Sequence, residues 1–478
     1  MTAPVKNSIV ALSFILLSSF CVQLQADELD SLLSGFEEES SADDEDDLEE
    51  LLGGFSELET EPQDVQPESD PLLPDWLTFQ GSVSLQSTIN VAQSEPMPGQ
   101  PDYRGLSMFR GHGELIAEAS FSEWKARIGG TAFYDAAYHL NGQRDLYTDE
   151  YLDEYEDELE LNEAYLQGSL SSALDIKLGR QIVVWGKSDN LRVTDILNPL
   201  DRRYPGMLDI RYLRLPVTMS RIDYFWDRWN INAMLIHEPR FDKFTRYNGE
   251  FFPGIQPLPP LVTPDWSWEN QQAGLALNGI FSGWDLSFYA ASVFQERAYL
   301  SNDPEGKPFR THDNRAVMVG SAADIVLGSW LFKGEAAYWD GLKYSTVSDE
   351  KPRFDILAGL EYMGFPETTV SFEIVNRHII DYDPEMESLP DGQKEDWTQY
   401  ALRFVKDFMN DTLHLTCLIS SYGLLGADGG FERFQLDYDL TDNVSVMAGV
   451  VFYESGNFPG FKEIGSNDRL LFELEYRF

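Results

Sequence analysis

The side chains of this 478-residue sequence best suited to acid–base chemistry near neutral pH are its six histidines. They are His112, His139, His237, His312, His378 and His414. A hydrolase needs a nucleophile, a base and a group that orients the base. No Gly-x-Ser-x-Gly, His-Glu-x-x-His or paired metal-ligand spacing surrounds any of the six. The sequence therefore predicts no catalytic residue, metal site or cofactor, although serines and aspartates near His112 and His139 leave a lipase-like enzyme as an alternative.

A second feature is a basic stretch within a chain whose net charge is −46. Residues 178–192 read Leu-Gly-Arg-Gln-Ile-Val-Val-Trp-Gly-Lys-Ser-Asp-Asn-Leu-Arg, and residues 195–201 read Asp-Ile-Leu-Asn-Pro-Leu-Asp. From Arg180 to Arg221 there are eight basic and four acidic residues. Because guanidinium groups bind carboxylates and other anions in bidentate pairs, this stretch predicts either contact with a solute or bracing against carboxylates.

The scaffold for these side chains is indicated by alternating apolar and polar residues from Trp76 onward. The alternation runs from Trp124 to Leu140, so that Ala126, Ile128 and Tyr138 would face one way, and Lys125 and Arg127 the other. Eighteen such segments are predicted, beginning near residues 77, 107, 124, 158, 174, 217, 229, 271, 284, 315, 330, 354, 368, 398, 412, 430, 444 and 468. In a β-barrel only alternate residues face lipid, so a mean hydropathy of −0.31 is compatible with a membrane protein.

The connections between these segments alternate strictly between short and long. Short turns on the periplasmic side and long outer loops are typical of outer-membrane barrels, whereas a soluble sandwich has no reason to sort its loops by length. Four tryptophans directly follow short turns and would form part of an aromatic girdle: Trp124, Trp229, Trp284 and Trp330. The sequence predicts an all-β fold, a transmembrane antiparallel β-barrel of about 18 strands, with 16 also compatible.

The last segment of the chain ends on an aromatic residue. Leu470, Phe472, Leu474, Tyr476 and Phe478 fall on one face of a strand, and mostly charged residues fall on the other. This pattern resembles the C-terminal signature that the assembly machinery of outer-membrane barrels reads. We therefore interpret these five residues as an assembly signal.

The N-terminal part of the chain has a different composition. Lys6, an apolar run over residues 9–22 and a small residue at position 26 predict a signal peptide over residues 1–26. Residues 27–75 contain 20 acidic residues and no Lys or Arg, which predicts an acidic, disordered or partly helical periplasmic tail before a barrel over residues 76–478. With this charge, nucleic acid is not an expected partner.

The tail contains one motif twice, in residues 29–36 and 48–55. In each copy the apolar positions i, i+3, i+4 and i+7 form one face of a two-turn helix. Such short helices are marginal in water and would be stabilised by a partner groove, so we expect docking to a partner, with a solvated leader as the alternative. The candidate docking residues are Leu29, Leu32, Leu33, Phe36, Leu48, Leu51, Leu52 and Phe55.

In a barrel this acidic, the basic segment over residues 186–216 is predicted to fold inward and narrow the lumen. The candidate lumen and constriction residues are Arg180, Lys187, Asp189, Arg192, Asp195, Asn198, Asp201, Arg202, Arg203, Arg211, Arg214 and Arg221. The candidate braces on the wall include Glu114, Glu118, Glu163 and Asp135. Thr194 is also expected to cap one helical turn that ends at Pro199.

The pieces Gly-Arg-Gln, Trp-Gly-Lys and Asn-Pro-Leu-Asp within residues 178–201 resemble the proteobacterial outer-membrane β-barrel family of unknown function numbered 1302. The Gly-Arg-Gln piece also looks like the alginate-export porins, although the acidic tail departs from that family. The resemblance implies an outer-membrane barrel whose relatives are associated with inner-membrane exporters of the resistance-nodulation-division type. It brings no known substrate and no catalytic residue.

Together, these features predict a channel or conduit in the outer membrane of a Gram-negative bacterium, passing a solute or a lipid-like cargo. The expected partners are outer-membrane lipid, the barrel assembly machinery, and a periplasmic or inner-membrane exporter component. An outer-membrane enzyme and a structural anchor are the alternatives.

Overall fold

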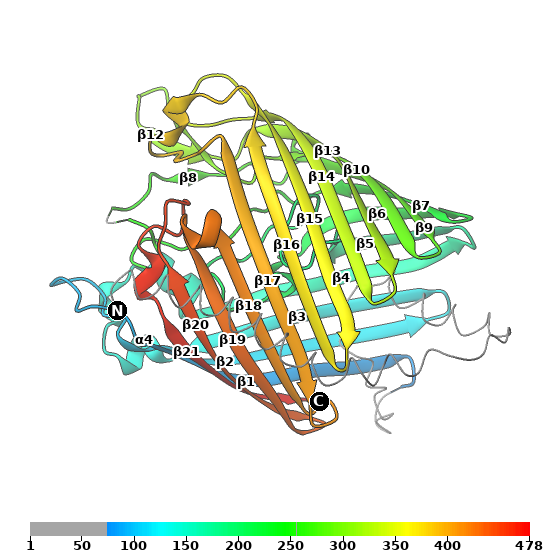
Figure 1. The fold of residues 1–478 in the computed structure, drawn as a ribbon, viewed down its shortest axis with the longest axis horizontal. Helices are drawn as coiled ribbons and strands as arrows, with labels where there is room; N and C mark the ends of the chain where they lie inside the picture. Colours follow the sequence, from blue (N-terminus) through cyan, green and yellow to red (C-terminus); the bar gives the residue numbers. More distant parts are fainter. Residues whose placement is uncertain (1–73, 255) are drawn as a thin grey trace, which may run out of the picture.

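The computed structural model describes residues 74–254 and 256–478, in which eighteen antiparallel strands form a barrel (Figure 1). Each strand pairs with the next, and β21 pairs back to β1 from Ser82–Arg477 to Asn90–Arg469, which closes the sheet. The barrel strands are β1 (Leu77–Asn90), β2 (Gly105–Phe121), β3 (Trp124–Asp135), β4 (Asp157–Ser171), β5 (Leu174–Gln181), β6 (Val217–Trp226), β7 (Trp229–Ile236), β9 (Gln272–Phe281), β10 (Trp284–Phe294), β13 (Arg315–Leu327), β14 (Trp330–Leu342), β15 (Lys351–Phe365), β16 (Thr368–Ile379), β17 (Asp396–Phe408), β18 (Leu413–Tyr422), β19 (Gly430–Thr441), β20 (Val444–Glu454) and β21 (Arg469–Arg477). The predicted all-β, 18-stranded antiparallel barrel is confirmed.

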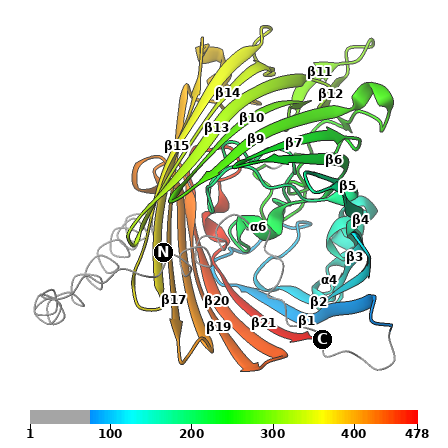
Figure 2. The same cartoon turned by 90° about the vertical axis from the view of Figure 1, so that its right-hand side faces the viewer.

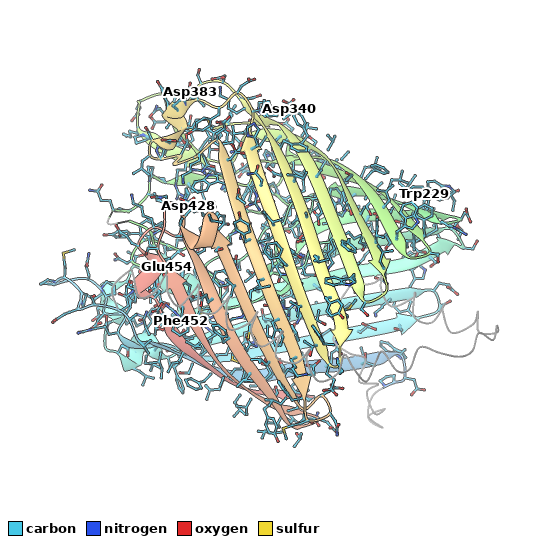
Figure 3. All side chains as sticks on the ribbon, in the orientation of Figure 1. Trp229, Asp340, Asp383, Asp428, Phe452 and Glu454 are labelled. Atoms are coloured by element: carbon cyan, nitrogen blue, oxygen red, sulfur yellow. The ribbon has the colours of Figure 1, made fainter. Side chains whose placement is uncertain are left out.

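The connections are sorted by length between the two ends of the barrel. Trp229, which follows a short turn, lies at the opposite end from Asp383 and Asp428, which belong to long connections (Figure 3). The long connections carry the remaining elements: α4 (Ala137–Leu140), η2 (Arg144–Leu146), α5 (Asp149–Tyr155), α6 (Ile210–Leu213), β8 (Leu261–Val262), η3 (Trp268–Asn270), β11 (Tyr299–Asn302), β12 (Pro308–Thr311), η4 (Pro384–Glu387), η5 (Leu424–Gly426) and η6 (Ile464–Ser466).

None of the helices in the described part of the chain is long and apolar enough to cross a membrane.

The two faces of the wall follow the alternation in the sequence, as β21 shows. Phe472, Leu474 and Tyr476 are exposed on the outside of the barrel. Glu473 and Glu475, which alternate with them, line the internal cavity. A strand with period-two alternation can satisfy lipid and water at once, and this explains why a chain of moderate hydropathy builds a barrel.

One expectation about a strand was wrong. The alternation after Trp124 suggested a strand continuing to Leu140, but β3 ends at Asp135 and α4 follows. Tyr138 on α4 packs against Tyr147 and Tyr151 instead of facing lipid, with ring centroids 5.1 and 6.1 Å away. Aromatic packing in the loop therefore overrides the strand pattern at this point.

The largest buried apolar cluster lies inside the barrel. It joins Trp185, Leu191 and Leu197 of the segment after β5 to inward residues of the wall such as Met219 and Met318. Much of the apolar core therefore holds an inward segment against the wall.

Candidate functional site

The segment that connects β5 and β6, residues 182–216, runs into the barrel, and α6 lies within its cross-section (Figure 2). Gly179 starts this departure from the wall. Its φ is +127°, and a Cβ there would lie 2.1 Å from the carbonyl oxygen of Ala164, so only glycine fits. Gln181 is fully buried, and its amide donates to the carbonyl oxygen of Met219 on β6 at 3.3 Å. The Gly-Arg-Gln piece is therefore a turning point that ends β5.

The Trp-Gly-Lys piece docks the segment on another part of the wall, at β10. The ring of Trp185 stacks on Tyr289 of β10, with centroids 4.8 Å apart. The amide of Gly186 donates to the Tyr289 hydroxyl at 3.1 Å, and Gly186 has a φ of +84°. A Cβ on Gly186 would lie 2.6 Å from a carboxylate oxygen of Glu335, so glycine lets the backbone approach that side chain.

Two buried carboxylates of the wall accept hydrogen bonds from the backbone of this segment. Glu335 of β14 accepts hydrogen bonds from the amides of Lys187, Ser188 and Thr194 at 2.7, 2.9 and 3.1 Å. Glu373 of β16 accepts from the amides of three consecutive residues, 189–191, at 2.9, 3.1 and 3.0 Å, and from the Ser188 hydroxyl at 2.7 Å. Hydrogen bonds to a charged acceptor are among the stronger ones, so these two side chains fix the first half of the segment.

Asn198 closes the base of the segment. Its side-chain oxygen accepts from the amide of Val183 at 2.8 Å, and its amide donates to the carbonyl of Leu215 at 2.9 Å. The helical turn expected from Thr194 to Pro199 does not form, because both the amide and the hydroxyl of Thr194 donate to Glu335. A carboxylate far away in the sequence has replaced the local cap.

The second half of the segment is held by arginines of the wall. Asp209, just before α6, pairs with Arg403 of β17 at 3.1 Å and with Arg433 of β19. Gly206 lies against the ring of Phe431, which a Cβ would approach to 2.7 Å. The segment leaves the wall at β5 and returns at β6, and in between it is anchored to β10, β14, β16, β17 and β19. It therefore crosses the lumen.

Below the segment lies a cavity of about 3250 Å³. Residues of the short turns line it, including Glu123, Gly283 and Asn443, and so do Lys187, Leu208 and other residues of the segment. Among the described residues, none from the long connections 91–104, 297–311, 343–350 and 380–395 lines the cavity. The lumen is therefore continuous with the short-turn end, and its other end is lined by the segment together with Lys243 of the connection after β7.

Seven of the twelve candidate lumen residues line this cavity: Lys187, Asp189, Asp201, Arg203, Arg211, Arg214 and Arg221. Arg180, Arg192, Asp195, Asn198 and Arg202 do not. Asp195, for example, receives Arg192 at 3.2 Å and Arg214 at 2.9 Å inside the segment.

Most of the candidate cations have a carboxylate partner, but the wall partners differ from those expected. Glu118 and Glu163 pair with Arg127, and Asp135 pairs with Arg110, so these contacts stay within the wall. The cations pair instead as follows: Arg180 with Glu160 and Glu238, Lys187 with Asp285 and Asp324, Arg202 with Asp242, Arg203 with Asp201 and Glu158, and Arg221 with Asp223.

Arg211 is different, because it pairs with no carboxylate in the described part of the chain. It is exposed to the cavity beside Tyr212, whose ring lies 4.7 Å from the guanidinium. Leu208, Tyr212 and Val184 of the segment are also exposed there, with exposed fractions of 52%, 65% and 45%. The cavity-facing surface of the segment thus combines apolar side chains with an available cation.

Asp201 illustrates the electrostatics of the segment. Burial alone would raise the pKa of its carboxyl, but the hydrogen bonds and charge of Arg203 outweigh burial and hold the pKa below its ordinary value. The pair is therefore ionised at neutral pH. Such a pair stabilises one arrangement of the segment, and breaking it would leave a buried charge without a partner.

The histidines do not gather around a nucleophile in the cavity. His112 of β2 lines the cavity, whereas His139 lies on α4 and contacts Glu156 at 3.2 Å. His237 accepts from or donates to the Ser220 hydroxyl at 2.8 Å, on the outward face of β6 and β7. His378 of β16, Asp396 of β17 and the adjoining Glu395 place ligand atoms within 4.8 Å of one another, and this is the one such grouping found in the described residues.

The terminal residues close the barrel. The amide of Phe478 donates to the carbonyl of Gly81 on β1, and the Gly81 amide donates back, both at 2.9 Å. The other assembly-signal residues, Leu470, Phe472, Leu474 and Tyr476, lie on β21. The eight docking residues of the tail and the signal peptide lie outside the described residues.

Comparison with known proteins places this geometry in a family. A family model described as a protein of unknown function, DUF1302, matches residues 106–478. No curated protein matches the chain. Among solved structures, OccAB3 of Acinetobacter baumannii matches with a TM-score of 0.50 at 12% identity, covering 84% of this chain and 99% of that one. A BenF-like porin of Pseudomonas fluorescens Pf-5 matches with a TM-score of 0.50 at 10% identity, covering 84% and 98%. At such identities the likeness shows that the chain shares a porin fold.

Proposed function

The chain belongs to the DUF1302 family, and on that premise we propose that it is an outer-membrane conduit for an amphipathic or lipid-like cargo, gated by residues 182–216. The barrel fold, with its apolar outer face and polar interior, fits the outer membrane. The N-terminal tail then lies in the periplasm, on the side of the short turns.

One observation carries this proposal, namely the cavity of about 3250 Å³ that is open at the short-turn end and covered by the segment. The segment is held by side chains of the wall and not by a strand ladder. A barrel that served only as an anchor would need neither an internal cavity nor buried carboxylates to position a lumenal segment. In the proposed gate the segment has two arrangements: it is seated while its apolar, hydrogen-bond and ion-pair contacts with the wall are made, and released when they are lost.

The class of cargo follows from the surface that faces the cavity. Val184, Leu208 and Tyr212 are apolar and exposed to it, and Arg211 adds a cation without a carboxylate partner in the described residues. A purely hydrophilic solute would gain nothing from the apolar groups. A molecule with an apolar chain and an acidic head would use both kinds of contact.

Planar-bilayer recording of the purified barrel tests the gate. Removing residues 190–212 takes away the covering segment, so single-channel conductance should rise well above that of the wild type. A matched control removes residues 303–306, the tip of the β11–β12 hairpin, which does not line the cavity, and should conduct like the wild type. Equal conductance of the two deletions would show that residues 190–212 do not limit flow.

We propose three kinds of partner, one for assembly of the barrel, one for its outer face and one for transport. The barrel assembly machinery would read the C-terminal strand, outer-membrane lipid would surround the apolar outer face, and the tail would dock a periplasmic or inner-membrane exporter component.

The lipase-like alternative would rest on the Ser220–His237 contact, and it predicts phospholipid hydrolysis that Ser220→Ala abolishes. We expect no hydrolysis by the purified barrel and unchanged conductance in this variant.

A further inference from the structure

The seam between β4 and β5 is incomplete at the long-loop end. β4 pairs with β3 from Asp157 onward, but it pairs with β5 only from Ala164. Residues 157–163 therefore have no strand on the β5 side, because Gly179 turns the chain into the lumen just after this point. Between neighbouring strands of the described barrel, this is the longest overhang without a partner.

This free edge lies at the level of the apolar band. Gly168 of β4 pairs with Trp124 at the short-turn end. A strand rises about 3.3 Å per residue, and a tilt of about 40° reduces this to roughly 2.5 Å along the barrel axis. An apolar band of about 25 Å therefore spans roughly ten residues and reaches from Gly168 to about Glu158. Open sheet edges are costly in hydrocarbon, so this edge requires another kind of closure.

Side chains provide that closure. The Nε of Arg180 donates to the carbonyl oxygen of Leu161 at 2.6 Å, in the place that a neighbouring strand would occupy. Glu160 receives three cations: Arg180 at 3.0 Å, Arg240 at 2.6 Å and Lys243 at 3.0 Å. Arg240 and Lys243 come from the connection after β7 and are not part of the wall. Glu160 therefore joins the wall to a loop.

The two sides of this closure face different environments. Glu160 and Asn162 line the cavity. Leu159 and Leu161 alternate with them and face outward, with exposed fractions of 85% and 46%. At this height the edge of β4 is joined to the loop after β7 by these ion pairs and not by a strand ladder.

We propose that the upper β4–β5 seam is a lateral exit through which a lipid-like cargo passes between the lumen and the outer leaflet, with Glu160 as its latch. The inference rests on the proposed function, because it supplies the conduit with an outlet into the membrane. Ion pairs to a loop separate without breaking the ladder of the wall. The polar head of such a lipid would pass among Glu160, Arg240 and Lys243 while its chains stay against Leu159 and Leu161.

Thiol labelling in proteoliposomes tests this exit, in a background in which Cys417→Ser leaves the mature chain without cysteine. Asn162→Cys places a thiol in the cavity beside the seam, and Gln435→Cys places one in the cavity on β19, several strands away. A water-soluble maleimide should label both. A phosphatidylethanolamine with a maleimide on its headgroup should label Asn162→Cys several-fold faster than Gln435→Cys. Equal rates with the lipid reagent, or labelling of neither thiol by it, would overturn the exit.

Two further substitutions test the latch. Glu160→Gln weakens the attraction to all three cations, so labelling of Asn162→Cys by the lipid reagent should rise several-fold. Glu163→Gln is the matched control, because Glu163 lies on the same strand but pairs with Arg127 inside the β3–β4 wall. If both variants label at the rate of their parent, Glu160 is not the latch. Failure of the water-soluble reagent to reach either thiol would refute the conduit itself, which separates the two proposals.

Discussion

Glu373 is almost fully buried, and its carboxylate accepts hydrogen bonds from three consecutive backbone amides and one hydroxyl of the inward segment. In Glu373→Ala these donors lose their acceptor, at a cost of about 1–3 kcal/mol for each one that water does not reach. We expect the released arrangement to become populated and conductance to rise, with more frequent openings in single-channel records.

Glu114→Gln is the control for this prediction. Glu114 also lines the cavity from the wall, but it makes no hydrogen bond to the segment among the described residues. If Glu373→Ala and Glu114→Gln conduct like the wild type, the carboxylate does not hold the gate.

The sequence did not single out Glu373 or Glu335. The basic stretch was visible because charge composition is local, and so Arg203 and Lys187 could be selected. Their partners could not be selected, because alternation places a carboxylate on the inner face without telling which distant backbone it meets. Glu335 lies 141 residues after Thr194, which donates to it. One usable signal was Gly186, since glycine lets the backbone approach another group closely.

At the scale of elements, β21 supports a prediction about assembly. Phe478→Asp puts a charge on the lipid-facing end of the terminal strand, where such substitutions cost only about 0–1 kcal/mol near the interface. Stability alone would therefore tolerate the change. If the assembly machinery reads this residue, the variant should fail to show heat-modifiable migration and should remain protease-sensitive in the periplasm.

Phe408→Asp provides the comparison, because Phe408 ends β17 at the same end of the barrel but lies outside the C-terminal strand. It should assemble normally. Normal assembly of both variants would mean that Phe478 carries no signal.

Strands were predictable because each wall position has only two environments, lipid and lumen, and the period-two pattern records both. The tryptophans that follow short turns marked the starts of β3, β7, β10 and β14, and the predicted starts at Leu77, Leu174 and Val217 also coincide with the structure. The loops were less predictable, because their environment is made by other loops. α4 forms in place of a continued strand because Tyr138 packs against Tyr147 and Tyr151. An alternation pattern carries no information about such contacts between residues of the loop.

At the scale of the whole molecule, the position where the chain enters the barrel constrains the tail. The amide of Ser120 donates to the carbonyl of Trp76 at 2.8 Å, so the chain joins β1 beside the short turn at residues 122–123. The cavity opens at this same end. If the short-turn end faces the periplasm, as proposed, a tail attached here has two destinations within reach, a partner on that side or the lumen itself.

Charge favours the partner. The tail carries 20 acidic residues, and Asp439, Glu473 and Glu475 line the cavity close to its open end. Like charges repel a tail that enters there, whereas a basic groove on another protein would attract it in a salt-dependent way. Burying the apolar face of each tail motif contributes ~25 cal/mol per Å² to the free energy of binding. Part of this gain is lost in ordering the segment, so one copy alone should bind weakly.

Replacing Leu32, Leu33, Leu51 and Leu52 with serine should therefore abolish transport while the barrel still assembles. Each pair alone should do less, because two copies on one chain raise the local concentration of the second once the first is bound. A photocrosslinker at Leu51 should capture a different protein, and raised salt should weaken the capture. Crosslinks that land on residues 186–216 of the same chain would instead show that the tail enters its own lumen. Unchanged transport with no crosslink of either kind would show that the leucines bind nothing, because a docked stripe must bury them against some surface.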